Sequence, residues 1–184
     1  MIKKNILTIL TLMIPLACNA ITLNEQIQLR SELELVCQSY KTNCNVRYID
    51  SYIPQAYTTY HGNIVFTTGL TNYLSYQELR AVGMHEVGHR VLKHYQSIDK
   101  FLKTWNFDLK ELQEFRNNGE YQADLFATLY FKQINQKNYL PEALIKLTAP
   151  NKLNVTTRTH PSTNSRINKI KTIENCCTKR NLLK

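Results

Sequence analysis

Apolar residues recur at roughly helical spacing along much of the chain. Over residues 22–39, leucine, isoleucine and valine follow this spacing, which predicts an amphipathic helix for which Asn24 is a candidate cap. The same pattern predicts five further helices, over about residues 75–95, 108–116, 119–132, 141–147 and 161–173. The last of these has Pro161 in its first turn, where proline is well tolerated.

Between the first two predicted helices, the pattern changes to β-branched and aromatic residues interrupted by turn residues. Strands are expected at 46–49, 56–60 and 64–67, and His61-Gly62-Asn63 supplies a hairpin turn between the last two. We find no internal repeat and no linker. The chain therefore predicts one mainly helical α+β domain with a small antiparallel sheet.

The first twenty residues differ from the rest of the chain. Lys3 and Lys4 precede an almost wholly apolar stretch, and small or polar residues follow it before Ile21. This pattern is typical of a secretory signal peptide. We expect residues 1–20 to be a signal peptide and 21–184 to be the mature, periplasmic or secreted domain. Lipid anchoring through Cys18 is the alternative, which the proline at position 15 disfavours.

Four cysteines would remain after such cleavage: Cys37, Cys44, Cys176 and Cys177. An even number in an exported chain predicts disulfides. A bond between the adjacent Cys176 and Cys177 would close a strained ring, so we expect both disulfides to tie the N-terminal region to the tail. A structural zinc site of four cysteines is the rival interpretation, but neither cysteine pair has the usual C-x2-C spacing.

The net charge is +9, and the loss of Lys3 and Lys4 would lower it by two. A basic surface favours anionic partners, so peripheral contact with an anionic cell-envelope surface is one expectation. The basic residues are spread along the chain without a dense run. Because no nucleic-acid motif is present, we expect no nucleic-acid partner.

A metal-binding pattern lies within the second predicted helix. Ser75 and Glu78 form a capping box that starts this helix. His85 and His89, in the run His85-Glu86-Val87-Gly88-His89, are four residues apart and so share one helix face. Two such imidazoles can bind one zinc ion, and Glu86 can reach a water on that ion. Gly88 costs helix stability, which suggests that a strand or substrate approaches the helix there.

Two histidines leave a catalytic zinc one protein ligand short. Glu120 stands at the start of a predicted helix 31 residues after His89, and Asp124 follows it one helical turn later. Glu120 can be the third ligand, while Asp124 can accept a hydrogen bond from a ligand imidazole and fix its orientation. The alternative is an ordinary solvated acidic pair.

The combination of these motifs resembles the HtpX and CAAX-prenyl-protease family of zinc metallopeptidases, and most of all its soluble periplasmic BepA-like and Oma-like branch. The resemblance rests on His85-Glu86-Val87-Gly88-His89, Glu120-Tyr121-Gln122-Ala123-Asp124 and Thr159-His160-Pro161, with Arg166 after them. It implies one zinc ion per chain held by His85, His89 and Glu120, with Glu86 as catalytic base and Asp124 as support. The chain lacks the hydrophobic spans of HtpX and the helical repeats of BepA, so their partners are not carried over.

The resemblance also places His160 near the metal, where it would stabilise the oxyanion or occupy the open position and hold the enzyme latent. Arg166 would pair with a nearby acid or be exposed, and His61 and His94 are interpreted as structural. The expected activity is hydrolysis of unfolded polypeptides, with the strand at 64–67 pairing with the substrate backbone. The alternatives are a non-proteolytic zinc-binding quality-control factor and an exported effector.

Overall fold

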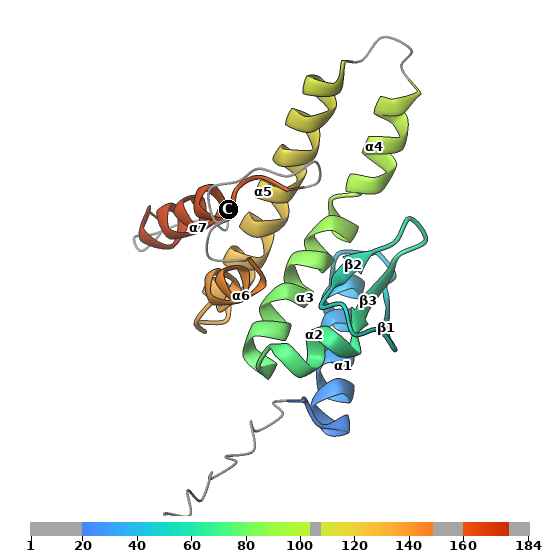
Figure 1. Ribbon diagram of the computed structural model, residues 1–184, viewed down its shortest axis with the longest axis vertical. Helices are drawn as coiled ribbons and strands as arrows, with labels where there is room; N and C mark the ends of the chain where they lie inside the picture. The colour runs from blue at the N-terminus through green and yellow to red at the C-terminus, as the bar shows by residue number, and fades with distance from the viewer. Residues whose placement is uncertain (1–19, 104–107, 149–159, 177–184) are drawn as a thin grey trace, which may run out of the picture.

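Two long helices, α3 (Tyr76–Val91) and α5 (Leu109–Gln133), pack side by side in the computed structural model, which describes residues 20–103, 108–148 and 160–176. A small sheet and α1 cover one side of α3, and α5 leads on its other side to α6 and α7 (Figure 1). The remaining elements are α1 (Leu23–Ser39), β1 (Asn45–Ile49), β2 (Ala56–Thr58), β3 (Asn63–Thr67), α2 (Thr68–Tyr73), α4 (His94–Leu102), α6 (Leu140–Leu147) and α7 (Thr163–Cys176). The predicted mainly helical α+β class is confirmed.

The central position of α3 follows from its sequence. The predicted capping box forms, with the Ser75 hydroxyl accepting from the Glu78 amide and the Glu78 carboxylate accepting from the Ser75 amide. Beyond this cap almost every residue from Glu78 to Gly88 is buried. A helix that is buried nearly all round belongs in the middle of a fold, and α3 accordingly contacts α1, the sheet and α5.

Gly88 allows α5 to approach α3 closely. A Cβ atom at Gly88 would lie 3.0 Å from the Cα atom of Ala123 on α5. The sequence predicted that a strand or substrate approaches Gly88, whereas the structure has helix α5 there. This close approach brings the second half of α3 against the part of α5 that carries Glu120 and Asp124.

The sheet is mixed, which corrects the prediction of a purely antiparallel one. Its strand order is β1-β3-β2; β2 pairs with β3 in antiparallel register, as the hairpin signal predicts, but β1 runs parallel to β3. Four of the five residues of β3 are buried, as suits a central strand. Both edges of β3 are paired with neighbouring strands, so the predicted pairing of the strand at 64–67 with a substrate backbone is wrong. Within this sheet, β2 is an edge strand and keeps one unpaired edge.

Several predicted helix boundaries are wrong. The helix expected to run to about Tyr95 ends at Val91, and α4 starts at His94 after Lys93 adopts a left-handed backbone with φ 58°. The two helices expected over 108–116 and 119–132 are one continuous helix, because Gly119 is tolerated inside α5. Thr22, rather than Asn24, caps α1 together with Glu25. The last helix starts at Thr163, after Pro161.

The cysteine pairing also differs from the expectation. Cys37 and Cys44 form a disulfide between the end of α1 and the start of β1. The left-handed Lys41 reverses the chain between them and brings their Cα atoms to 6.0 Å, so neither is available to the tail. Cys176 is exposed with a free thiol at the end of α7. Cys177 lies outside the described residues, as do Cys18 and nearly all of the expected signal peptide.

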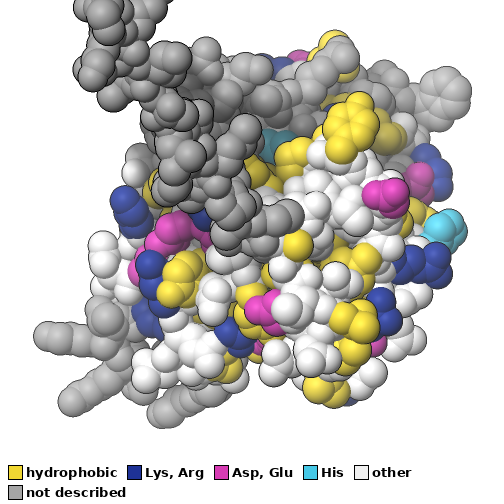
Figure 2. Space-filling model, turned by 60° about the horizontal axis from the view of Figure 1, so that its bottom comes forward, with side chains coloured by type: hydrophobic (Ala, Val, Ile, Leu, Met, Phe, Trp, Pro, Cys, Tyr) yellow, Lys and Arg dark blue, Asp and Glu magenta, His cyan; other side chains and the backbone are white. Residues whose placement is uncertain are grey.

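None of the helices that the structure describes is long and apolar enough to cross a bilayer. On the face shown in Figure 2, lysine and arginine side chains lie interspersed with acidic and hydrophobic ones. That distribution agrees with the spread of basic residues along the sequence.

Candidate metal centre

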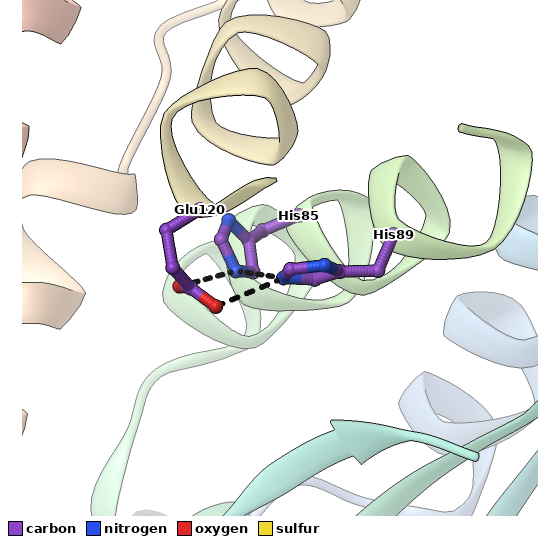
Figure 3. A group of neighbouring side chains, drawn as sticks. All are labelled: His85, His89 and Glu120. Carbon is purple, nitrogen blue, oxygen red and sulfur yellow. Dashed lines mark hydrogen bonds and ion pairs between the residues drawn. The ribbon is translucent and has the colours of Figure 1, made fainter. Parts of the chain in front are cut away.

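His85 and His89 project from α3 toward Glu120 on α5 (Figure 3). The two imidazole Nε2 atoms are 3.0 Å apart. Oε2 of Glu120 lies 3.5 Å from Nε2 of His85, and Oε1 lies 3.4 Å from Nε2 of His89. Residues 31 and 35 positions apart in the sequence thus bring two imidazole nitrogens and a carboxylate to one point, and all three side chains are largely buried.

This geometry fits a shared metal ion. Two ligand atoms that are each about 2.1 Å from one tetrahedral zinc ion are roughly 3.4 Å from each other, close to the separations of 3.0, 3.4 and 3.5 Å observed here. The donor set of two imidazoles and one carboxylate suits a divalent transition metal and leaves a fourth position open. His85, His89 and Glu120 can therefore hold one metal ion.

The other nitrogen of each ligand ring contacts a further side chain. Nδ1 of His85 lies 2.9 Å from Oδ1 of Asp124, as the sequence predicts. Nδ1 of His89 lies 2.9 Å from Nδ1 of His94, whose Nε2 is 3.0 Å from Oε1 of Gln122. Such contacts fix ring orientation and tautomer, and here they turn both Nε2 atoms toward Glu120.

The interpretation of His94 as merely structural is incomplete, because its ring contacts a candidate metal ligand. A straight helix would carry a residue five positions after His89 to another face. The left-handed turn at Lys93 changes the direction of the chain, and the ring of His94 returns to His89. Burial, with a smaller contribution from His89, lowers the pKa of His94 to about 4. Its imidazole is therefore neutral at neutral pH and can either donate to or accept from His89.

Arg166, which the sequence left either paired or exposed, is buried against the centre. Its guanidinium donates to both carboxylate oxygens of Asp124, at 2.6 and 2.8 Å. It also lies 3.3 Å from Nδ1 of His85 and 3.4 Å from Oε2 of Glu120. The positive charge from α7 thus offsets the two carboxylates that support the ligands from α5.

The charges at the centre perturb its pKa values strongly. Burial alone would lower the pKa of His85, but the carboxylates of Asp124 and Glu120 raise it to about 9. Burial alone would raise the pKa of Asp124, but Arg166 and His85 bring it to about 2. Opposing its own burial, contacts with His160, His85 and His89 hold the pKa of Glu120 well below its usual range. The metal-free centre therefore pairs anionic carboxylates with a protonated imidazole.

His160 lies beside the third ligand, with its Nδ1 2.9 Å from Oε2 of Glu120 and its side chain half exposed. The same carboxylate oxygen also lies 3.5 Å from Nε2 of His85 and 3.4 Å from the guanidinium of Arg166. His160 therefore adds a further polar contact to the ligand that α5 supplies.

Glu86 lies beside the ligands, and a neighbour that the sequence did not reveal holds it. The hydroxyl of Thr58 on β2 is 2.8 Å from Oε2 of Glu86 and 2.9 Å from its carbonyl oxygen. Thr58 is almost fully buried. No local motif signals this contact, because it joins residues 28 positions apart through the packing of β2 on α3.

The ligands open onto a cavity of about 720 Å³. Glu86, His89, Glu120 and His160 line one part of it, next to Gln55–Tyr57 at the edge strand β2. The remaining wall comes mainly from α4 and from the first half of α5. A cavity that contains the candidate metal, a carboxylate base and an unpaired strand edge can accept an extended polypeptide next to an activated water.

Comparison with known families agrees with this site. The model of peptidase family M48 matches residues 24–110 and 98–174. The first segment includes His85, Glu86 and His89, and the second includes Glu120 and Asp124. The comparison with individual curated proteins gives no match. The family match spans most of the 184 residues, and the chain therefore belongs to peptidase family M48.

Proposed function

We propose that the protein is a zinc-dependent endopeptidase that hydrolyses peptide bonds of unfolded or misfolded polypeptides. The convergence of His85, His89 and Glu120 on one point beside Glu86 carries this proposal. Membership of the M48 peptidases supports it independently. Zinc is the ion to which two imidazoles, one carboxylate and an open fourth position are best suited.

A bound zinc ion would supply a Lewis acid that polarises the scissile carbonyl and lowers the pKa of water toward about 7. Glu86 accepts the proton of the attacking water and passes it to the leaving amine. Thr58 holds one oxygen of this carboxylate, and Glu86 lines the cavity. We assign the donor for the oxyanion to His160, because it lines the same cavity.

We propose that the substrate backbone pairs with the unpaired edge of β2. Gln55, Ala56 and Tyr57 line the cavity beside Glu86, and backbone pairing with an edge strand requires an extended segment. Unfolded chains offer such segments, whereas folded domains rarely do. We further propose that the protein acts in the periplasm or outside the cell, on the strength of the sequence pattern in residues 1–20.

Cleavage of an unfolded protein tests the proposal. Wild-type protein loaded with zinc should cleave casein, and removal of the metal by a chelator should abolish cleavage. Glu86→Gln should bind zinc in the same stoichiometry and leave casein intact, because it keeps the ligands and removes the base. If wild type and Glu86→Gln both bind zinc and are equally inert, the protein is instead a non-proteolytic binding factor.

A further inference from the structure

Among the residues that the structure describes, one arginine that lines the cavity has no polar partner. Arg116 on α5 stands one helical turn before Glu120, is half-buried and faces the same space. Among the described residues it makes no ion pair and no side-chain hydrogen bond. The buried arginine of the centre, Arg166, is by contrast committed to Asp124.

Apolar side chains from two helices line the same cavity as Arg116. They are Tyr95 and Ile98 from α4 and Phe115 from α5, and polar residues of these helices, such as Ser97 and Gln122, lie among them. Phe115 stacks on Phe101 of α4, with ring centroids 5.1 Å apart, so the aromatic wall is fixed by packing between the two helices. The carboxylates that line the cavity, Glu86 and Glu120, lie at the metal centre, and Glu120 is one helical turn from Arg116 on the same helix.

From this arrangement we infer that Arg116 and the α4–α5 wall form a subsite that selects a substrate carboxylate near the scissile bond. The inference rests on the proposed function and names its substrate class. Arginine presents several donors in a planar fork that matches a carboxylate, and the low-dielectric wall strengthens such a contact. The preferred substrate is a polypeptide that carries an acidic group among apolar side chains.

The spacing of Arg116 and Glu120 on α5 gives the expected distance, in substrate residues, between that carboxylate and the scissile bond. Four residues of helix span about 6 Å along the axis, and an extended peptide advances about 3.4 Å per residue. The carboxylate therefore belongs about two residues from the scissile bond. An acidic side chain and a free C-terminus both offer this chemistry, and the experiment separates them.

The test uses internally quenched peptides that differ at one position. A single Glu is moved along both flanks of the scissile bond and compared with Gln and Lys, and the Gln peptides are made with free and with amidated C-termini. At one position about two residues from the bond, Glu should raise kcat/KM about tenfold over Gln, the lower range for a hydrogen bond to a charged group. If instead only the free C-terminus raises kcat/KM, the carboxylate source is the chain end.

Two variants assign the preference to Arg116. Arg116→Ala should bring the Glu-to-Gln ratio close to one, and Arg116→Glu should invert it in favour of Lys. Lys110→Glu makes the same charge change on the same helix at an exposed residue, and it should keep the wild-type preference. A ratio unaffected by Arg116→Glu, or a wild type that prefers no carboxylate at any position, overturns the inference.

Failure of the proposed function is separable from failure of the subsite. If the wild type cleaves no peptide, binding of the labelled Glu and Gln peptides is measured by fluorescence anisotropy on zinc-loaded Glu86→Gln protein. The subsite predicts about tenfold tighter binding of the Glu peptide and loss of that difference in Arg116→Ala. Equal dissociation constants for both peptides exclude the subsite, whatever the catalytic activity.

Discussion

The functional residues of the centre are held by side chains from other elements. Thr58 comes from β2, His94 from α4 and Arg166 from α7, and they contact Glu86, His89 and Asp124 respectively. Because these contacts form when the chain folds, the conformational entropy of the functional side chains is lost on folding and not during the reaction. Replacing them should therefore reduce turnover without removing the metal ligands themselves.

Thr58 offers the cleanest test of this effect. Thr58→Val keeps the shape of the side chain and removes the hydroxyl that holds Oε2 of Glu86. We expect kcat for casein-derived peptides to fall about tenfold, a part of the 10²- to 10⁴-fold that a general base contributes, while KM and zinc stoichiometry stay unchanged. Thr58→Ser keeps the hydroxyl and should retain most of the activity. An unchanged kcat in Thr58→Val would show that the contact does not position the base.

Protonation of His85 should make zinc binding dependent on pH. The neighbouring carboxylates raise its pKa to about 9 in the metal-free centre, against its burial. Below that pH zinc must displace a proton, so the apparent Kd should fall about tenfold for each unit of pH increase between pH 6 and 8. Competition with a chelator of known affinity measures this slope, and calorimetry in buffers of different ionisation enthalpy counts the released proton. An affinity that is constant over this range would contradict the expectation.

At the scale of elements, local signals in the sequence predicted what local interactions determine. The capping box at Ser75 starts α3 where expected, and the turn before Asn63 forms the hairpin, with Gly62 at φ 87°. The left-handed Lys93 was not predictable, because lysine has no preference for that backbone region. The turn at Lys93 separates α3 from α4 and brings the ring of His94 against His89.

The packing of α5 on α3 through Gly88 gives a prediction for stability. In Gly88→Ala, the new Cβ atom would meet the backbone of Ala123 at 3.0 Å. Overpacking of this kind costs about 1–3 kcal/mol, more than the roughly 1 kcal/mol that alanine gains over glycine in a helix. We expect a net loss of about 1 kcal/mol in urea unfolding.

Gly119→Ala is the matched control for this substitution. Its Cβ atom would make an ordinary contact, 3.6 Å from the ring of His94. The helix propensity of alanine should then dominate, and stability should stay equal or rise by up to about 1 kcal/mol. Equal losses in the two variants would mean that helix packing at Gly88 is no tighter than elsewhere on these helices.

For the whole molecule, the sequence predicted the site better than it predicted the topology. Residue type and spacing were enough to predict the candidate ligands His85, His89 and Glu120, and the three side chains do converge. The parallel pairing of β1 with β3 and the Cys37–Cys44 bond depend on how the chain turns in space. The first arrangement forms through long-range packing, which no composition or spacing rule reveals. The second joins cysteines only seven positions apart, and the sequence disfavoured it only because it leaves Cys176 and Cys177 to pair with each other.

The metal should also stabilise the whole fold, because its ligands join α3 to α5 and Arg166 adds α7. An ion that binds only the native state stabilises it by about 4 kcal/mol at a free concentration of a thousand times Kd. For a domain of this size, each kcal/mol shifts Tm by about 2–4 °C, so chelation should lower Tm by about 8–16 °C. His89→Ala removes one ligand, and its Tm should be insensitive to chelator. A wild-type Tm that chelation does not change would mean that the three ligands do not hold a shared ion in the native protein.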